Sequence, residues 1–189
     1  MVISKLTNKR VVMVIAPDQF RDEELLVPRQ ILEAAGATVK VASRSKMECT
    51  GMLGAKVKPE LLISEVKMAE FDAIVVVGGM GSPEYLWGDR LLHALLVEAQ
   101  ASGKTTAAIC LSGAVLARAG VLTGRRATVY QTADSMKEFE KGGVVYTGEP
   151  VTVDGNLVTG ENPDAARAFG EAIVAKLTAP AGVSRGTTA

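Results

Sequence analysis

The segment from Lys104 to Gly120, KTTAAICLSGAVLARAG, joins two kinds of predicted structure at one cysteine. Small and β-branched residues from Thr105 to Ile109 are typical of a buried strand, whereas Val115 and Leu116 belong to an apolar pattern with helical spacing. The strand therefore ends at Cys110, and the helix begins directly after it. A strand followed at once by a helix is the unit from which α/β proteins are built.

The position of Cys110 favours a reactive sulfur. A sharp turn between a strand and a helix resembles a nucleophile elbow, in which the side chain stands above the edge of the sheet. The free N–H groups at the start of a helix stabilise a thiolate, so we expect them to lower the pKa of this cysteine. The alternative is a buried core residue, because free cysteine packs as a small hydrophobe. The choice between the two depends on the loops that surround Cys110.

The composition excludes several classes of function. The 21 basic and 21 acidic residues cancel, so no charged surface for nucleic acid is expected. Cys49 and Cys110 form no C-x-x-C pair, and with His93 as the only histidine a zinc site of the usual type cannot be assembled. We therefore expect neither a metal nor a cofactor.

The length of 189 residues corresponds to one domain. We expect this domain to span residues 1–178 and the aperiodic segment 179–189 to form a flexible tail. The first ten residues are too polar for a signal peptide, and the apolar run after them is broken by Pro17 and Asp18, far short of a membrane span. These features predict a cytoplasmic protein without membrane contact, in which a free thiol persists.

Apolar runs alternate with helical patterns along the whole chain. The expected strands cover residues 10–16, 37–42, 72–77, 105–109 and 127–130, the expected helices cover 22–35, 61–69, 89–101, 133–141 and 164–177, and a loop or short hairpin covers 43–59. A second hairpin is expected around residues 154–156. The alternation predicts βαβ units and one doubly wound, largely parallel sheet with helices on both faces.

In such a sheet, ligands bind at the carboxyl ends of the strands, where the strand order reverses. Three loops are expected to meet there: residues 16–24, residues 78–84 and the corner at Cys110. The pair Gly78 and Gly79 allows backbone N–H groups to approach an oxyanion, because glycine has no Cβ. The alternative for this pair is an ordinary turn at the end of a strand.

Five motifs follow one another along the chain. They are F-x-D-x-E-L-x-x-P from Phe20 to Pro28, VVVGG from Val75 to Gly79, SPE from Ser82 to Glu84, AAIC from Ala107 to Cys110, and AGVLxGRxAT from Ala119 to Thr128. Together they resemble the ThiJ/PfpI superfamily, which includes the Parkinsonism-associated deglycase protein and the PfpI intracellular proteases. The match spans residues 10–178. The resemblance implies a flavodoxin-like three-layer α/β/α sandwich that assembles as a homodimer or a higher homo-oligomer.

The resemblance also assigns roles to residues by their position in the motifs. Cys110 matches the nucleophile, and Glu24 matches the glutamate that hydrogen-bonds to its sulfur. Gly79 and Leu111 match the backbone donors beside the sulfur. Glu84 resembles a residue that PfpI-type proteins contribute across a subunit interface, although its spacing from the glycines is one residue longer here. The residues expected to line the site or a subunit interface are Gly78, Glu84 and Tyr130.

Two histidine positions of the family hold other residues in this chain. Leu111 follows the cysteine where PfpI-type proteases have a histidine, and Tyr130 stands where the deglycase branch has one. His93 lies on a predicted helix, and we expect it at the surface or at an interface. Without a Cys-His dyad, Glu24 is left as the acid and base, and burial and like-charge repulsion should raise its pKa.

The segment Tyr85-Leu86-Trp87 follows Glu84 and has two alternative interpretations. Exposed Leu and Trp side chains would anchor a subunit interface beside the site. Trp87 could instead pack within its own subunit, as tryptophan commonly does. Cys49 lies in the less regular connection, and we expect it to be dispensable.

The leading functional hypothesis is attack of the Cys110 thiolate on a small reactive carbonyl such as methylglyoxal, as in glutathione-independent glyoxalase III or deglycase chemistry. Glu24 would shuttle protons, and the N–H groups of Gly79 and Leu111 would stabilise the oxyanion. One alternative is an intracellular cysteine peptidase or amide hydrolase of PfpI type, which the missing histidine disfavours because the leaving amine needs a proton. Another is a non-enzymatic oxidative-stress sensor or chaperone, in which Cys110 oxidises reversibly.

Overall fold

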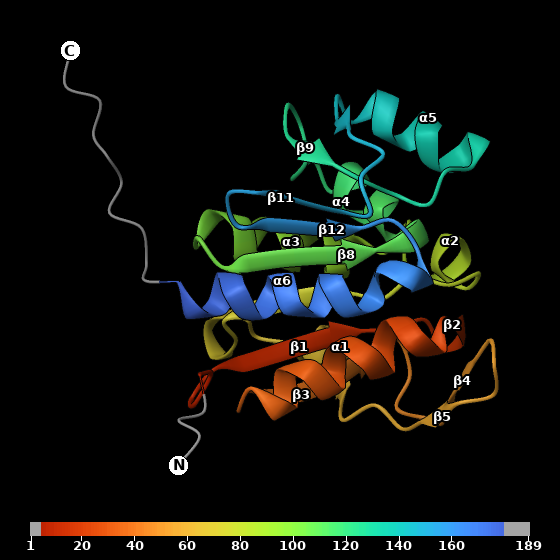
Figure 1. Cartoon of the computed structure of the whole chain (residues 1–189). Coiled ribbons are helices and arrows are strands. Elements are labelled where there is room, and N and C mark those ends of the chain that lie inside the picture. The colour runs from red at the N-terminus through yellow and green to blue at the C-terminus, as the bar shows by residue number, and fades with distance from the viewer. Residues whose placement is uncertain (1–4, 180–189) are drawn as a thin grey trace.

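The computed structural model describes residues 5–179 and is built around a seven-stranded sheet (Figure 1). The order across the sheet is β11-β12-β8-β7-β1-β3-β6. Its strands are β1 (Arg10–Val14), β3 (Thr38–Ser43), β6 (Leu61–Leu62), β7 (Ala73–Val76), β8 (Thr105–Ile109), β11 (Val151–Asp154) and β12 (Leu157–Gly160). Every pairing in this sheet is parallel except that of β11 with β12, which form the hairpin predicted around residues 154–156.

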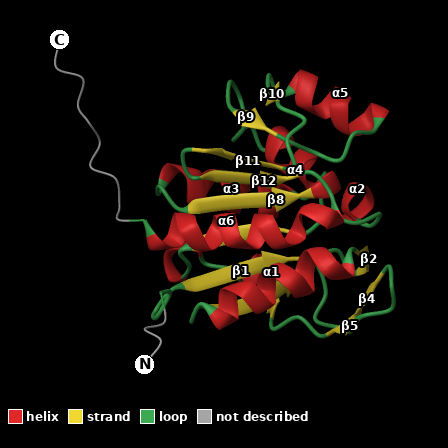
Figure 2. Ribbon diagram, viewed as in Figure 1, coloured by secondary structure: helices red, strands yellow, loops and turns green. Residues whose placement is uncertain are grey.

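Helices cover both faces of this sheet, as Figure 2 shows by colour. On one face, α1 (Asp22–Ala34) packs beside α6 (Ala166–Thr178). On the other face lie α3 (Arg90–Ala101) and α4 (Gly113–Arg118). The three layers confirm the predicted flavodoxin-like α/β/α sandwich with a largely parallel sheet. Within residues 5–179, no helix is both long and apolar enough to cross a lipid bilayer.

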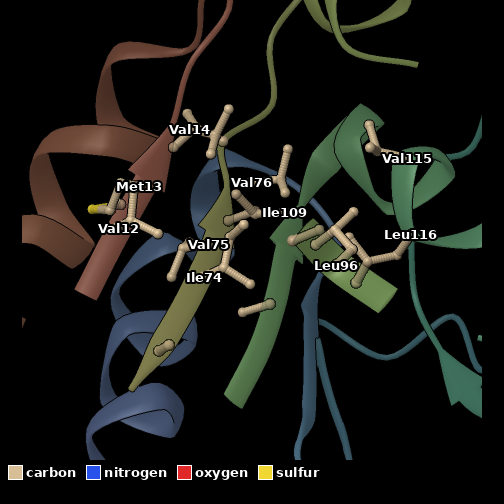
Figure 3. Packing of buried hydrophobic residues seen from close by; sticks show 14 of the residues in the cluster. Val12, Met13, Val14, Ile74, Val75, Val76, Leu96, Ile109, Val115 and Leu116 are labelled. Carbon is tan, nitrogen blue, oxygen red and sulfur yellow. The ribbon is translucent and has the colours of Figure 1, made fainter. Parts of the chain in front are cut away.

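The central strands are apolar along most of their length because both of their faces are covered. Residues 11–14 of β1 and residues 73–76 of β7 are fully inaccessible to solvent. In Figure 3, the side chains of these strands pack in one cluster with Ile109 of β8, Leu96 of α3 and Leu116 of α4. Burying one such aliphatic side chain is worth about 1.5–3 kcal/mol, so these runs fix the central strands of the sheet.

The strand order reverses between β1 and β7. From β1 the chain passes to β3 on one side and then returns to β7 on the other side, and both neighbours are in parallel register with β1. Val14, the last residue of β1, is paired with Ala42 of β3 and with Val76 of β7. The loops that follow these strands therefore emerge at the carboxyl edge, where an open α/β sheet binds its ligands.

The prediction of a helix over residues 61–69 is wrong. After β6 the chain makes two 3-10 turns, η1 (Ile63–Glu65) and η2 (Met68–Glu70). The Glu65 carboxylate accepts the N–H of Leu62 at 2.9 Å, and the Lys104 ammonium binds the carbonyl oxygen of Met68. Leu61 and Leu62 pair with β3 in the sheet instead, and the two side-chain contacts hold the turns that follow.

The strand expected over residues 127–130 is much shorter than predicted. It is reduced to β9 (Arg126–Ala127), which pairs with β10 (Val145–Tyr146) outside the main sheet. The next residue, Thr128, donates its N–H to the hydroxyl of Thr159 at 2.9 Å. A side chain therefore replaces the ladder hydrogen bond that would continue the strand.

The remaining elements lie near the carboxyl edge and beyond β11. Residues 43–59 contain the short hairpin that was one of two alternatives, and its first strand also pairs with β2. The elements are β2 (Asp18–Phe20), β4 (Cys49–Gly51), β5 (Lys56–Val57), α2 (Ser82–Tyr85) and α5 (Ala133–Lys141). Helix α2 has only four residues, too few for a periodic pattern. Residues 180–189 of the predicted tail lie outside the described residues.

Asp22 fixes this hairpin to the start of α1. Its buried carboxylate accepts the N–H groups of Leu53 at 2.8 Å and Ala55 at 2.7 Å. We expect Asp22→Ala to lower the free energy of unfolding in urea by about 1–3 kcal/mol, because both N–H groups lose a charged acceptor. The control, Glu33→Ala, removes an exposed ion pair with Arg29 and should cost less than about 1 kcal/mol. Equal losses in the two variants would contradict the anchoring role.

Candidate active site

The three predicted loops meet at the carboxyl edge, close to β2 and α2 (Figure 1). The N–H of Arg21, in the loop after β1, donates to the carbonyl oxygen of Gly78 at 3.0 Å. In the same contact, Gly81 donates to the carbonyl oxygen of Gln19 at 3.1 Å. Backbone hydrogen bonds therefore hold the first two loops together, and the third loop begins at Cys110.

Cys110 occupies a strained corner of the backbone. It follows β8 directly, begins the 3-10 turn η3 (Cys110–Ser112) and has a φ angle of 60°. A left-handed conformation at a residue other than glycine costs about 1–3 kcal/mol and is found mainly where function requires it. Its carbonyl oxygen accepts the N–H of Tyr130 at 3.3 Å, and the residue is 7% exposed. The backbone thus has the geometry of the predicted nucleophile elbow.

Glu24, in the first turn of α1, is fully buried beside this corner. Its Oε2 accepts the N–H of Gly78 at 3.0 Å. The carboxyl also contacts the Cys110 thiol, and each group alters the pKa of the other. Its second oxygen, Oε1, is buried without a regular hydrogen bond among the described residues. Because Oε2 is already occupied by a donor, Oε1 is the oxygen available to carry a proton.

Gly78 makes this close approach possible. A Cβ at this position would collide with Oε2 of Glu24 and would lie 2.7 Å from the Cβ of Cys110. Real Cβ atoms do not approach other heavy atoms so closely. The glycine pair is therefore more than an ordinary turn, since any side chain at residue 78 would separate the carboxyl from the thiol.

Two backbone donors act on the sulfur. The N–H groups of Leu111 and Gly79 hydrogen-bond to Cys110 and favour its thiolate, lowering the pKa. Gly79 has a φ of 106°, a conformation open to glycine but rarely to other residues. The structure thus brings Cys110, Glu24, Gly78, Gly79 and Leu111 together in one site.

The expectation that the helix start lowers the pKa of Cys110 is wrong as a net effect. Burial, followed by the Glu24 charge, raises this pKa from 9.0 to about 12, although the two N–H donors partly oppose these effects. Burial also raises the pKa of Glu24, from 4.5 to about 8, as predicted in direction, but the hydrogen bond with Cys110 lowers this pKa instead of raising it. Because the groups are coupled, they titrate as one pair, which loses its first proton near pH 8.

Trp87 and Leu86 do not form an exposed interface anchor. Leu86 is fully buried, and the indole Nε1 of Trp87 donates to the carbonyl oxygen of Leu111 at 2.9 Å. The alternative of packing within the subunit is therefore correct. His93, on α3, lies behind this contact, with Nε2 3.0 Å from the carbonyl oxygen of Trp87, and burial lowers its pKa. It is half-buried rather than on the open surface.

Glu84 and Tyr130 lie at the surface around the site. Glu84 is exposed on α2, and its charge raises the pKa of Tyr85. Its role across a subunit interface stays a prediction. Tyr130 is 46% exposed and lines a cleft of ≈ 450 Å³ with Arg21 and Arg167.

Other candidate sites are less suitable for chemistry. A cavity of ≈ 370 Å³ at the opposite edge of the sheet is lined by Lys9, Asp72 and Lys104. Lys9 pairs with Asp72 at 3.0 Å, and Lys104 binds two backbone carbonyls, so these charges are already satisfied. Among residues 5–179, no three His, Cys, Asp or Glu side chains gather as metal ligands.

No role was predicted for Ser82 or Ser112 from the sequence, and packing within the subunit was one of two interpretations of Trp87. All three residues are buried around the elbow. A serine in an elbow turn is compatible with solvent exposure, so the sequence offers no signal for this packing. The only cues in the sequence are that Ser82 stands in the SPE motif and that Ser112 follows the predicted donor Leu111.

The titration of the pair predicts which thiol reacts. With iodoacetamide, Cys110 should be alkylated faster than Cys49, and its rate should rise with pH around a midpoint near 8. Cys49 is fully buried, and burial raises its pKa. In Glu24→Gln the midpoint should move above 9, because the thiol loses its base while it stays buried. Mass mapping of the labelled peptides measures both rates.

Two outcomes would contradict this account. Labelling of Cys49 before Cys110 would remove the reactive thiol from the elbow. An unchanged midpoint in Glu24→Gln would show that the carboxyl does not control the proton of Cys110.

Comparison with known proteins places the whole fold in one family. The family model described as the DJ-1/PfpI family matches residues 9–176. An uncharacterized protein of Methanocaldococcus jannaschii is 48% identical over 165 residues, 87% of this chain and 80% of the relative. A protein of Pyrococcus abyssi named as a deglycase is 36% identical over 152 residues, 80% of this chain and 90% of the relative.

A solved structure agrees with these sequence matches. The crystal structure of a ThiJ/PfpI domain protein from Brachyspira murdochii has a TM-score of 0.85 and 32% identity, and the match covers 90% of this chain and 96% of that chain. The motifs, the site geometry and these likenesses agree. The chain belongs to the DJ-1/PfpI family.

Proposed function

We propose that this protein is a cysteine-dependent enzyme that converts small reactive carbonyls, such as methylglyoxal, without glutathione. The observation that carries the proposal is the buried pair of Cys110 and Glu24 beside the N–H groups of Gly79 and Leu111. The small exposed fraction of Cys110, 7%, favours a small substrate over a folded protein chain. Relatives named as deglycases support the same class of chemistry.

In the first step, the pair supplies both the nucleophile and its base. Ionised Glu24 takes the thiol proton as the Cys110 sulfur bonds to the aldehyde carbon. The electron pair of the C=O π bond moves to oxygen, where backbone N–H groups stabilise the new charge. Glu24 then returns its proton to that oxygen and gives a hemithioacetal. A carboxyl with a pKa of about 8 is suited to both transfers near neutral pH.

In the second step, the same carboxyl moves one hydrogen between adjacent carbons. Glu24 removes the hydrogen of the former aldehyde carbon as a proton and delivers it to the oxygen of the neighbouring carbonyl, which gives an enediol. It then takes the hydroxyl proton of the first carbon and delivers it to the second carbon. The first carbon is oxidised to a thioester while the second is reduced to an alcohol, so no external oxidant is needed. Water then cleaves the C–S bond, the sulfur regains its proton, and a 2-hydroxy acid leaves. The net change is the addition of one water.

The two alternative functions fit the site less well. A peptidase must protonate a leaving amine, but Leu111 stands next to the nucleophile and the Nε2 of His93 is engaged with the carbonyl oxygen of Trp87. A peroxide sensor depends on thiolate character and exposure, and Cys110 is buried with a raised pKa. Addition to an aldehyde requires neither a leaving amine nor a resting thiolate.

The decisive experiment follows methylglyoxal and lactate by proton NMR with purified protein and no added thiol. Wild type should convert methylglyoxal into lactate. Its kcat/KM should rise with pH through about 8, as the pair of Glu24 and Cys110 loses its first proton. Cys110→Ser should abolish turnover. Glu24→Gln should lower it by about 10²–10⁴-fold, since one general acid and base is lost. Cys49→Ser is the matched control and should keep turnover.

Other results select other functions. Peptide cleavage that depends on Cys110, without aldehyde turnover, would replace this proposal with the peptidase. Neither activity, together with a stable sulfinate at Cys110 under mild peroxide, would favour the sensor.

A further inference from the structure

Two buried serines connect the loops that carry the backbone donors. Ser82 begins α2, three residues after Gly79, and Ser112 ends η3, one residue after Leu111. Both serines are fully buried. Their hydroxyl oxygens are 2.7 Å apart, and the Ser112 hydroxyl donates to the carbonyl oxygen of Val77 at 2.7 Å.

The direction of these hydrogen bonds follows from their acceptors. A carbonyl oxygen only accepts, so the single proton of the Ser112 hydroxyl is used at Val77. The proton between the two serines must therefore come from Ser82. The result is a directed chain from Ser82 to Ser112 to the end of β7. Val77 immediately precedes Gly78 and Gly79, so the chain ends on the backbone that carries one of the donors.

Trp87 adds a second connection between the same two loops. Its indole nitrogen binds the carbonyl oxygen of Leu111 at 2.9 Å, while the N–H of Leu111 binds the Cys110 sulfur. Leu111 is thus held at both its N–H and its carbonyl. Around the elbow, every one of these contacts is buried, where a hydrogen bond is stronger than in water.

We propose that Ser82 and Ser112 are positioning residues, which hold the N–H groups of Gly79 and Leu111 at the sulfur of Cys110. Donors stabilise an oxyanion or a thiolate only at hydrogen-bond distance, and removal of one such donor from an enzyme costs about 10²–10³ in rate. A partial displacement of both N–H donors should lower the rate by less than the complete removal of one donor does. The catalytic part of this inference depends on the proposed carbonyl chemistry, whereas the effect on the thiol does not.

The test compares Ser82→Ala and Ser112→Ala with a matched control. Ser43 is also fully buried and donates to a backbone carbonyl, that of Ile15, at 2.8 Å, but it belongs to β3 and touches neither donor loop. Ser43→Ala therefore removes the same kind of hydrogen bond elsewhere. For each variant, the pH dependence of Cys110 alkylation, the values of kcat and KM, and the thermal midpoint are measured.

The serine variants should raise the pH midpoint of Cys110 alkylation by about one unit. At a pH well below the midpoint, this shift corresponds to an alkylation rate about tenfold lower than that of wild type. Their kcat should fall about ten- to hundredfold with little change in KM, because the lost interaction acts on the reacting atoms. Ser43→Ala should lower thermal stability only. The double variant should resemble Ser112→Ala, since both serines act through one chain.

The inference is overturned if Ser82→Ala and Ser112→Ala shift only the thermal midpoint, as Ser43→Ala does. If Ser112→Ala does not fold, Ser82→Ala alone decides, because it leaves the bond from Ser112 to Val77 in place. A wild type without aldehyde turnover would reject the proposed function, yet the alkylation midpoints would still test the role of the serines.

Discussion

The contact between the Glu24 carboxyl and the Cys110 thiol is the constraint on which the rest of the site depends. Glu24 comes from the first turn of α1, and Cys110 from the corner after β8. In the sheet, β7 lies between β8 and β1, the strand of the main sheet that precedes α1 in the chain. The two side chains can meet only because the residue at the end of β7, Gly78, has no Cβ and turns its N–H toward the carboxyl. The left-handed backbone at Cys110 completes the approach. The contact between Glu24 and Cys110 therefore requires both a strained backbone at Cys110 and the absence of a side chain at Gly78.

The burial of Glu24 beside Cys110 lowers stability at the pH where the proposed reaction uses the pair. The folded pKa of Glu24, about 8, is above its ordinary value of 4.5, so the folded state holds a proton that the unfolded chain has released. The stability that this proton contributes is fully present below pH 4.5 and is lost as the pH rises through about 8. In that range the pair gains the negative charge that the proposed reaction uses. Such a compromise between stability and activity is common where a charged group must be buried to work.

Local patterns predicted the architecture well, because a parallel sheet covered on both faces requires continuous apolar runs such as residues 11–14. They also predicted the three loops and the positions of Cys110 and Glu24, since the carboxyl ends of parallel strands share one edge. They failed where pairing in the sheet overrides a local pattern. Residues 61–62 pair with β3 as the edge strand β6, so the helix expected over residues 61–69 does not form. They failed again for the pKa of Cys110, because burial is a property of the whole fold, whereas the dipole of a helix start is visible in the sequence.

The absence of a histidine beside Cys110 limits the chemistry that one carboxyl can perform. With Leu111 in that position, Glu24 is the carboxyl that both hydrogen-bonds to the thiol and acts on it by charge, whereas Arg21 interacts with Cys110 by charge. A single acid and base can return only the proton that it has taken, unless a second group refills it. Addition to a carbonyl and the transfer of hydrogen between adjacent carbons both meet this condition, because every proton accepted is used in the next transfer. Expulsion of an amine meets the proton count as well, since the thiol proton can pass to nitrogen, but it also requires the carboxyl to reach that nitrogen and protonate it as the C–N bond breaks. Leu111 cannot share this task as a histidine would, so the site fits isomerisation and hydration better than peptide hydrolysis.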